Sequence, residues 1–367
     1  MNHQVAAFTD TYLPTVNGVT YTIDTWRDRW NRDGGRMDVV YPRSDGHSPG
    51  PHEHPVRSVA FPWYQGYRLG APKIPDAVES VDVVHAHTPY ALGLGAMRLA
   101  RRADAPLVAS YHTPGGEYTD YLAPTEGIAS GLRGFVEGYE RWFFNRADRV
   151  VVPTEPVRQY LRAELGIETR VEVVSNGIDT EHFRPTDATA FRERHDLVGE
   201  RLVGYTGRHG YEKRLTDLID AAEGLDATVV LGGDGPARED LRAQAADSDA
   251  DVRFLGFLDR EEMPAFYSAL DVFAFPSPVE TQGLVALEAN ACGTPVVGVD
   301  SGALSETVED GVTGYHFPSE DVDAFRARIE DVLADGDDLA ENCLERRDEI
   351  SVGRTVERLA DLYGSVS

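Results

Sequence analysis

The chain has 367 residues, of which 41% are apolar, and a formal net charge of −27 at pH 7. This length suits two α/β domains of ordinary size. The apolar share excludes wholesale disorder, so the negative charge belongs to a folded surface. Such a surface also disfavours nucleic acid as a partner, because nucleic-acid binding needs a basic footprint.

Lysine is almost absent: Lys73 and Lys213 are the only two, and nearly all positive charge comes from arginine. Together with the net charge, this depletion indicates a protein adapted to molar salt inside a halophile; an acidic protein of an ordinary organism is the alternative. Cys292 and Cys343 have neither metal-ligand spacing nor a disulfide framework, which suits a reducing cytoplasm. With no signal peptide and no run of about 18 apolar residues, we expect a soluble protein, at most peripheral on the inner face of the membrane.

The first element is a buried strand over residues 4–10, QVAAFTD. A loop follows, and then a helix from about Val19 whose apolar face continues to Trp30. Strand, glycine turn and helix in this order aim a helix N-terminus at a ligand, but the dinucleotide fingerprint G-x-G-x-x-G is absent. The dipeptide Asn17-Gly18 is either part of a ligand-binding loop or an ordinary turn.

Four further runs of apolar and β-branched residues predict strands, and the last of them ends in a histidine. That residue, His112, stands at the carboxyl edge where open α/β sheets bind ligands. Its imidazole either donates a hydrogen bond to a ligand hydroxyl or phosphate, or packs in the core. The four strands cover residues 37–41, 56–60, 81–87 and 107–113.

A glycine- and tyrosine-rich stretch over residues 115–132 has no clear periodicity, and long loops of this kind often bind ligands. The helix after it, around 131–146, carries Phe135 and Trp142 among arginines. This helix either touches a membrane interface or packs on its own domain with its arginines in solvent.

Strands over 149–154 and 171–178, with a helix from Glu155 between them, complete the first half. The polar, turn-rich segment 175–185 then predicts a domain boundary near Ile178.

The second half begins with a strand over 201–209, RLVGYTGRH. Arg208 follows its last glycine, and Lys213 comes five residues later, before a helix from Leu215. Two cations at a strand-to-helix turn are what a diphosphate requires. Lys213 is also one of only two lysines that the chain keeps.

Three more strands lead to the loop that carries Glu280, and residues 295–299 predict the next core strand after it. Residues 227–236 predict a strand, a glycine turn and a helix that starts at Pro236. The other two strands cover residues 252–258 and 271–277.

Two glutamates stand out in residues 276–298, PSPVETQGLVALEANACGTPVVG. Glu280 lies in a proline-bracketed loop, a helix opens at Gly283, and Glu288 lies inside that helix. The helix N-terminus suits a phosphate, and a carboxylate further along can accept hydrogen bonds from sugar hydroxyls. The alternative is a capping acid followed by an acidic helix face.

The spaced glutamates and the run EANACGTPVV resemble the signature of the retaining glycosyltransferases of family four. The opening FTDTYLPTVNGV resembles that of family members which glycosylate lipids. This resemblance covers nearly the whole chain and implies the GT-B fold, an α/β fold of two Rossmann-like, doubly wound domains facing a cleft. We therefore expect an acceptor-side domain over 1–178, a nucleotide-sugar-binding domain over 179–350, and a C-terminal helix, 351–367, that packs back on the first domain.

The resemblance also implies roles for individual residues. Arg208 and Lys213 would hold the donor diphosphate and stabilise the leaving charge without a metal ion. Glu280 would position the donor sugar, with or without a covalent intermediate, and Glu288 would bind the ribose hydroxyls. The remaining donor-side candidates are Gly18 near the phosphates, His112 against the sugar, Phe257 beside the base, and Gln282, Gly283 and Leu284 at the helix N-terminus.

One candidate departs from the family pattern. Gln282 stands where the family usually carries Phe or another apolar residue, so the donor pocket is expected to differ in shape. His85 and His87 are weaker candidates, on the acceptor side.

The function implied is a retaining, metal-independent hexosyltransferase that needs no cofactor besides its donor substrate. The donor would be of the GDP-mannose or UDP-glucose type, and the acceptor a lipid, a lipid-linked sugar or a sugar. A sugar-nucleotide epimerase of the same fold is an alternative, which would turn over the donor without an acceptor. A non-catalytic nucleotide-sugar-binding protein is another, and it would tolerate Glu280→Gln.

Overall fold

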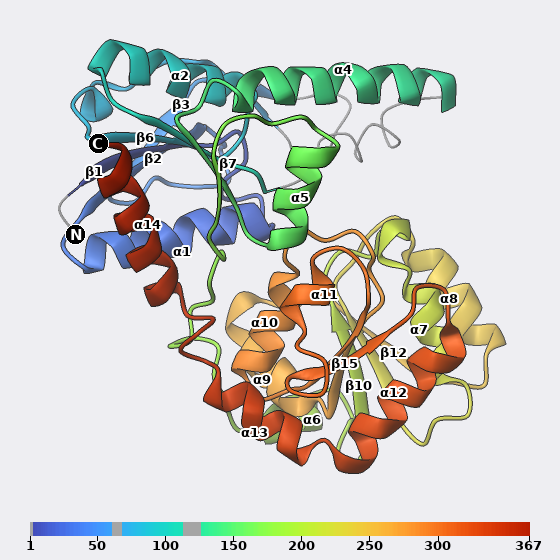
Figure 1. Ribbon diagram of the computed structural model, residues 1–367. Coiled ribbons are helices and arrows are strands. Elements are labelled where there is room, and N and C mark those ends of the chain that lie inside the picture. The colour runs from blue at the N-terminus through green and yellow to red at the C-terminus, as the bar shows by residue number, and fades with distance from the viewer. Residues whose placement is uncertain (1–2, 61–67, 113–125) are drawn as a thin grey trace. The chain divides into compact units, whose positions relative to one another are not determined.

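The computed structural model describes residues 3–60, 68–112 and 126–367, with the backbone alone for 126–131. The chain divides into two compact units (Figure 1). The first comprises Met1–Gly177 together with Val352–Ser367, and the second comprises Ile178–Ser351. The boundary lies one residue before the predicted one at Ile178.

The first unit contains a seven-stranded parallel sheet with the order β3-β2-β1-β6-β7-β8-β9. Parallel neighbours need crossover connections, and helices supply most of them. The strands are β1 (Gln4–Phe8), β2 (Arg36–Pro42), β3 (Glu53–Val56), β6 (Val83–Ala86), β7 (Leu107–Ser110), β8 (Arg149–Val152) and β9 (Val171–Val173).

The predicted single strand over 56–60 is wrong. β3 ends at Val56, and a separate antiparallel pair, β4 (Ser58–Ala60) with β5 (Arg68–Gly70), follows outside the main sheet. The reason is visible in burial, because Val56 is 4% exposed whereas Val59 is 64% exposed. A run of apolar residues does not reveal that its two ends face different environments.

Helices cover both faces of the first sheet (Figure 1). α1 (Gly18–Arg32) and α14 (Val352–Val366) pack on one face, where Trp26 and Trp30 are fully buried. α2 (Ala91–Ala103), α4 (Glu126–Phe144) and α5 (Glu155–Ala163) cover the other. Successive side chains of a strand point to opposite faces of the sheet. In β1, Val5 packs on the face that α1 covers, and Phe8 packs on the face that α2 covers. The C-terminal helix thus lies against α1, with Tyr363 5.2 Å from Trp30 between ring centroids.

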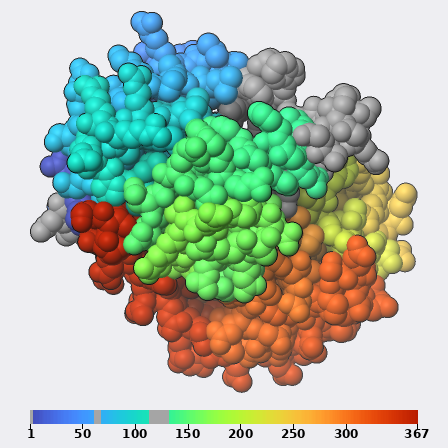
Figure 2. All heavy atoms as spheres, turned by 45° about the horizontal axis from the view of Figure 1, so that its top comes forward, coloured from blue at the N-terminus to red at the C-terminus, as the bar shows by residue number. Residues whose placement is uncertain are grey.

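α2 and α4 lie side by side on the face that Figure 2 turns to the viewer, α2 in cyan and α4 in green. Gly93 permits this contact, since a Cβ there would lie 2.2 Å from Thr88 O and 3.1 Å from the Phe143 ring. α4 buries Phe143 but leaves Phe135 73% and Trp142 39% exposed. The helix therefore packs on its own unit and keeps aromatic surface in solvent as well.

α4 begins before the predicted helix start at residue 131. Residues 113–125 lie outside the described residues, and they include most of the loop predicted over 115–132.

The second unit contains a six-stranded parallel sheet with the order β12-β11-β10-β13-β14-β15. α7, α8 and α12 lie on one side of it, and α6, α9, α10 and α13 on the other (Figure 1). The strands are β10 (Leu202–Thr206), β11 (Thr228–Gly232), β12 (Asp251–Gly256), β13 (Val272–Phe275), β14 (Val296–Val299) and β15 (Gly314–Phe317). The helices are α6 (Thr189–Arg194), α7 (Leu215–Ala222), α8 (Arg238–Asp247), α9 (Met263–Ala269), α10 (Leu284–Ala291), α11 (Leu304–Thr307), α12 (Val322–Asp335) and α13 (Asp337–Glu345).

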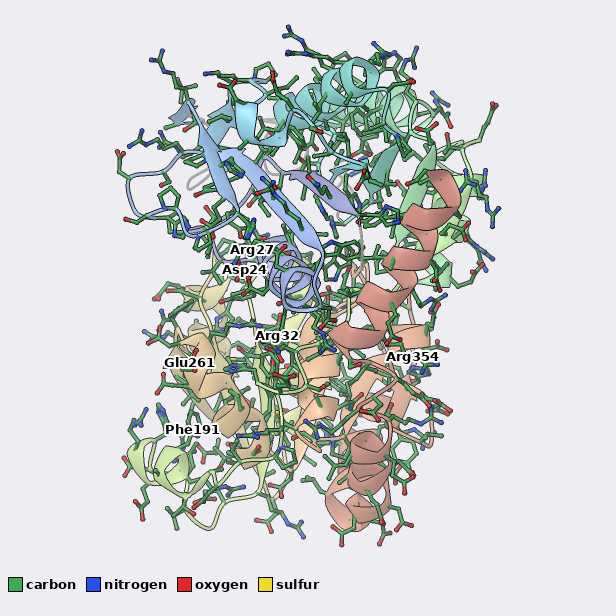
Figure 3. The ribbon with its side chains drawn as sticks, turned by 90° about the vertical axis from the view of Figure 1, so that its left-hand side faces the viewer. Asp24, Arg27, Arg32, Phe191, Glu261 and Arg354 are labelled. Atoms are coloured by element: carbon green, nitrogen blue, oxygen red, sulfur yellow. The ribbon has the colours of Figure 1, made fainter. Side chains whose placement is uncertain are left out.

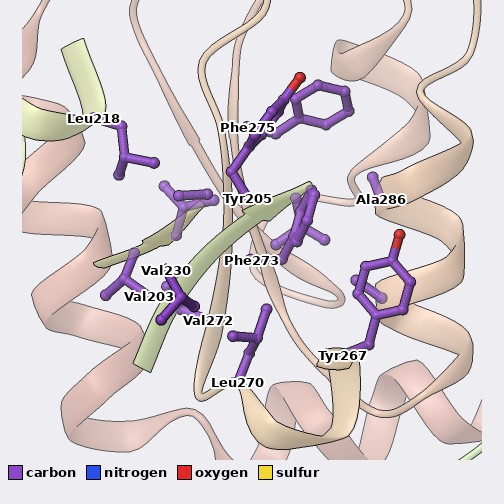
Figure 4. Close-up of a cluster of buried hydrophobic side chains, with 14 of the residues drawn as sticks. Val203, Tyr205, Leu218, Val230, Tyr267, Leu270, Val272, Phe273, Phe275 and Ala286 are labelled. Carbon is purple, nitrogen blue, oxygen red and sulfur yellow. The ribbon is translucent and has the colours of Figure 1, made fainter. Parts of the chain in front are cut away.

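The core of the second unit is close-packed on both sides of the central strands. Figure 4 shows Leu218 of α7 on one side and Tyr267 of α9 with Ala286 of α10 on the other. Glycine at position 204 of β10 is required there, because a Cβ would lie 2.3 Å from Leu270 Cδ1.

One predicted detail of the second unit needs correction. α8 begins at Arg238 and not at Pro236, which lies in the turn before it. The segment 175–185 contains the observed boundary, and from Ile178 onward it packs in the second unit, where Phe183 is 1% exposed.

Candidate functional site

Each sheet has one point where the strand order reverses, and candidate residues follow the strands at both points. In the second unit the order reverses between β10 and β13, and in the first between β1 and β6. In open α/β sheets, ligands bind at the carboxyl ends of the strands beside such a point. Arg208 and Lys213 follow β10, Glu280 follows β13, Gly18 follows β1, and His112 follows β7.

The turn after β10 is shaped by glycines. Gly207 has φ +141°, and a Cβ on Gly233 (φ +107°) would lie only 2.0 Å from Gly207 O. The loops after β10 and β11 therefore touch through their backbones, and His209 N donates to Asp234 O at 2.9 Å. This contact fixes the start of the segment that carries Arg208.

Both predicted cations form ion pairs with glutamates. Lys213 Nζ lies 2.5 Å from Glu280 Oε1, with side chains 18% and 16% exposed. Arg208 Nη2 lies 2.9 Å from Glu212 Oε1, and its side chain is 36% exposed. Two cations are thus held at the reversal point by carboxylates, which a phosphate oxygen can replace with the same geometry.

The predicted helix N-terminus is present as well. Gly283 caps α10 with φ +78°, and a Cβ there would lie 2.8 Å from Leu304 Cδ2 and 2.9 Å from Phe275 Cε1. Leu284 is the first helical residue, and the N–H groups of a first helical turn have no partner within their helix. Gln282 is buried, and its carbonyl oxygen accepts a hydrogen bond from Thr307 Oγ1 at 2.5 Å.

Glu288 lies inside α10, as predicted, and has a partner that the sequence did not reveal. It is 8% exposed, and its Oε2 accepts a hydrogen bond of 2.7 Å from Tyr267 OH. Burial raises the pKa of Glu288 to about 7, although the Tyr267 hydroxyl and the charge of Arg260 oppose the rise. Phe257 follows β12 with 66% of its surface exposed.

In the first unit, His112 is hydrogen-bonded to another candidate histidine. His87 Nδ1 and His112 Nε2 are 3.0 Å apart, and the two rings are nearly coplanar, with an interplanar angle of 14° and centroids 5.3 Å apart. Burial lowers the pKa of His112 to about 4 and that of His87 well below its ordinary value, so both rings are neutral near pH 7. The structure thus makes the two candidates one pair.

The expected acceptor-side role of His85 is not supported. His85 is fully buried, its Nδ1 lies 2.6 Å from Tyr363 OH, and its Nε2 lies 2.8 Å from Ser110 Oγ. Both ring nitrogens are bonded inside the protein, so this residue has no polar atom to offer a ligand.

Gly18 is the first residue of α1, and Asn17 is its cap. The Asn17 Oδ1 atom accepts a hydrogen bond of 2.9 Å from Thr20 N. The dipeptide is therefore a helix start and not a free-standing turn.

Asp10 is a buried carboxylate at the reversal point that the sequence did not single out. Its oxygens accept hydrogen bonds from Leu92 N at 3.1 and 3.2 Å and from Thr88 Oγ1 at 2.7 Å. Burial raises the pKa of Asp10 to about 6, against the hydrogen bond from Thr88. A carboxylate that caps a helix about eighty positions away leaves no local sequence pattern.

A second polar cluster, built around Arg27, ties α1 to the start of β3. Asp24 and Arg27 lie together on α1 (Figure 3), 2.7 Å apart. Arg27 Nη1 also pairs with Glu53 Oε1 at 2.6 Å, and Glu53 Oε2 lies 2.6 Å from His47 Nε2. Burial on its own raises the pKa of Glu53, but the hydrogen bond from His47 and the charge of Arg27 lower it below its ordinary value.

Two features are absent from the described residues. Within 3–60, 68–112 and 126–367, histidine, cysteine and carboxylate side chains form no group arranged to hold a metal ion. In that same part of the chain, no helix combines the length and the apolar character needed to cross a bilayer.

Two family models match this chain, each over a range that lies mainly in one of the two units. The family model "Glycosyltransferase Family 4" matches residues 16–182, and the model "Glycosyl transferases group 1" matches residues 187–349. The chain is 31% identical to the GDP-mannose-dependent alpha-mannosyltransferase of Mycobacterium tuberculosis, over 90% of this chain and 87% of that protein. It is 28% identical to the alpha-monoglucosyldiacylglycerol synthase of Streptococcus pneumoniae, over 98% and 85%.

Among solved structures, the sucrose-phosphate synthase of Thermosynechococcus elongatus matches with a TM-score of 0.79 and 23% identity, covering 99% of this chain and 98% of that one. At this identity the match shows the fold alone. The fold is GT-B, with a Rossmann-like parallel sheet in each unit.

Proposed function

The chain belongs to glycosyltransferase family 4, and from this premise we propose that it transfers a hexose, with retention of configuration, from a nucleotide-diphosphate sugar to a lipid or sugar acceptor. The observation that carries the proposal is the Lys213–Glu280 pair beside Arg208, at the strand-order reversal of the second unit. Lys213 and Arg208 are two cations at the position where an α/β sheet binds its ligands.

The donor diphosphate exchanges partners with the glutamates. Its oxygens take the place of Glu280 on Lys213 and of Glu212 on Arg208, so both cations move from carboxylate to phosphate without losing a charged partner. As the glycosidic bond breaks, negative charge grows on the leaving diphosphate, and prearranged cations stabilise this state more than the ground state. These cations do the work that a divalent metal ion does in other transferases.

The α10 segment holds the rest of the donor. The N–H groups of Gly283 and Leu284 lie at the positive end of the helix dipole, where they donate hydrogen bonds to a phosphate of the donor. Glu288 accepts hydrogen bonds from the ribose hydroxyls while Tyr267 holds its other oxygen in place. Glu280, once released from Lys213, positions the sugar and stabilises positive charge at its anomeric carbon. The leaving phosphate then takes the proton of the acceptor hydroxyl on the same face.

Three further residues are assigned to the donor. His112 contacts the sugar, Phe257 contacts the nucleotide base with its exposed ring, and the loop that ends at Gly18 approaches the phosphates.

The names of two relatives support the substrate classes that we propose. One is named for GDP-mannose and another for a glucosyl diacylglycerol product. We propose a GDP-mannose or UDP-glucose type of donor and a glycolipid precursor as acceptor, reached from the cytoplasmic side by a protein that binds the membrane peripherally. The exposed Phe135 and Trp142 on α4 support such binding, because aromatic side chains favour membrane interfaces.

The test is a transfer assay in molar KCl with each donor and either diacylglycerol or its monoglycosyl derivative in vesicles. Proton NMR of the product reads the anomeric configuration, and we expect the α-configuration of the donor. A β-product overturns retention, and donor turnover without any glycoside indicates the epimerase. Nucleotide binding without turnover in every combination, with Glu280→Gln unchanged, indicates the binding protein.

A further inference from the structure

His87 is placed to control the proton of His112. It directly follows β6 and is 2% exposed. Its ring stacks on His85, with centroids 4.2 Å apart, and lies nearly coplanar with the ring of His112, with an interplanar angle of 14° and centroids 5.3 Å apart. The hydrogen bond between His87 Nδ1 and His112 Nε2 is 3.0 Å long. Since two neutral imidazoles share this bond, one ring must donate and the other must accept.

The remaining nitrogen of His87 decides which ring donates. His87 Nε2 is buried, and no residue in the described part of the chain bonds it. If this atom carried the proton, a buried N–H would have no acceptor, whereas an unprotonated Nε2 leaves only a lone pair unused. Buried donors without partners are rarer in proteins than under-used acceptors. His87 therefore carries its proton on Nδ1 and donates to His112.

We propose that His87 is a positioning residue that holds His112 in the neutral tautomer protonated at Nδ1. His112 Nε2 accepts from His87, so the proton that His112 can donate sits on the opposite side of its ring. Any group that bonds this N–H, in the protein or in a ligand such as a sugar or a phosphate, must therefore be a hydrogen-bond acceptor. A ligand at this N–H rests on the proposed function; the tautomer itself does not.

The ring of His87 stacks on His85, which is hydrogen-bonded to the C-terminal helix. Tyr363 of α14 and Ser110 of β7 bond the two nitrogens of His85, which leaves His85 no freedom to rotate. His85 forms the platform on which His87 stacks. Trp26 closes the remaining side, with its ring centroid 5.6 Å from that of His87 and its Nε1 donating to Asn176 O.

The titratable neighbours of His87 favour a neutral ring. On its own strand and on the neighbouring one these are His85 and His112, and Tyr363 faces His85 from α14. His85 and Tyr363 are fully buried, and desolvation lowers the pKa of His85 to about 3 and that of His112 to about 4, so both histidines are neutral near pH 7. Near pH 7 these groups carry no charge that would favour one tautomer of His87 over the other.

The experiment reads the tautomer directly in the full-length protein labelled with ¹⁵N-histidine. A long-range ¹H–¹⁵N spectrum separates protonated from unprotonated ring nitrogens, and the signals missing from His112→Gln identify residue 112. We expect the wild-type His112 to be protonated at Nδ1 and unprotonated at Nε2, from about pH 6 to pH 8. A proton on Nε2 would overturn the proposal, whether or not the protein transfers sugar.

Substitution then tests the control by His87. In His87→Leu the donor to His112 is lost, and we expect proton density to appear on His112 Nε2 while kcat for transfer falls about tenfold. The matched control is His195→Leu in the second unit, whose Nε2 is likewise buried without a partner among the described residues. It should leave the signals of His112 unchanged. If His87→Leu keeps the wild-type tautomer, His87 does not set it; absence of transfer by the wild type would refute only the proposed function.

Discussion

Lys213 Nζ and Glu280 Oε1 are 2.5 Å apart, although 67 positions separate the two residues in the chain. The pair joins the loops after β10 and β13, the two strands between which the sheet order reverses. With neither side chain more than 18% exposed, the pair is shielded from salt more than a surface pair is. The contact therefore keeps a cation in place until an anion of higher charge competes for it.

Glu280→Gln separates the binding and catalytic roles of this pair. Removing the carboxylate frees Lys213 from its competitor, so affinity for the nucleoside diphosphate should rise about three- to tenfold, or roughly 1 kcal/mol. Transfer should fall by about 100- to 1,000-fold, because no carboxylate then faces the developing positive charge. Calorimetric titration and the transfer assay measure the two effects. Glu261→Gln, at an exposed glutamate of the same unit, is the control and should change neither. Weaker nucleotide binding by Glu280→Gln would refute the competition.

Gly283→Ala tests the geometry of the α10 N-terminus. Gly283 and Gly224 both have φ near +80°, but a Cβ at 283 would lie within 2.9 Å of Leu304 and Phe275, whereas position 224 is open. Both alanine variants bear the backbone strain, and only the first bears the clash. We expect the free energy of unfolding of Gly283→Ala to be lower than that of Gly224→Ala by about 1–3 kcal/mol, measured in urea. Equal losses of unfolding free energy in the two variants would show that the start of α10 accommodates a Cβ at residue 283 without strain.

Glu288→Gln should change the pH dependence of stability. The pKa of Glu288 is raised from 4.5 to about 7 by burial, so the folded chain binds a proton that the unfolded chain has released between these values. The contribution of this residue is therefore fully present below about pH 4.5 and lost as pH rises through about 7, by at most about 3 kcal/mol. Relative to wild type, Glu288→Gln should gain stability over that window.

Glu53→Gln is the contrast, because the pKa of Glu53 is lowered and not raised. The stability that Glu53 contributes is present above its ordinary pKa and lost as pH falls. Thermal unfolding midpoints at several pH values should therefore give slopes of opposite sign for the two variants relative to wild type. Parallel slopes would contradict the assignment of Glu288 as a carboxyl group that burial keeps protonated.

Salt should stabilise the whole chain. With a net charge of −27, the folded state repels itself, and screening relieves this repulsion. We expect the midpoint of thermal unfolding to rise steadily as KCl increases from about 0.1 M to about 2 M. A midpoint that peaks at low salt and then falls would contradict the adaptation to molar salt that we infer from the scarcity of lysine.

Periodicity and glycine turns were sufficient to predict alternating strands and helices, because these signals are local, whereas the GT-B fold was predicted from the family resemblance. Arg208, Glu280 and the start of α10 stand at strand ends, where an α/β sheet collects its ligands. The order of the strands is not local, and neither is the direct contact between Lys213 and Glu280. That contact depends on β13 lying next to β10, which residue spacing does not reveal.

One interpretation that failed and two contacts that the sequence did not reveal have the same origin. His85 looked like His87 in the sequence HAH, but the strand directs His85 into the hydrogen bonds with Ser110 and Tyr363. Asp10 caps α2 across the sheet, and Tyr267 meets Glu288 from the next helix. Each partner lies 21 or more positions away, so only the packed structure identifies it.

The most direct test is binding of GDP, UDP and ADP, each with its nucleoside as a control, measured by thermal unfolding in molar KCl. A ligand at about one hundred times its dissociation constant adds about 2.7 kcal/mol. We expect one diphosphate to raise the midpoint, its nucleoside to raise it far less, and the rise to disappear in a variant that combines Arg208→Ala with Lys213→Ala. No rise with any diphosphate, or an undiminished rise in the double variant, would contradict a donor site at the junction of β10 and β13.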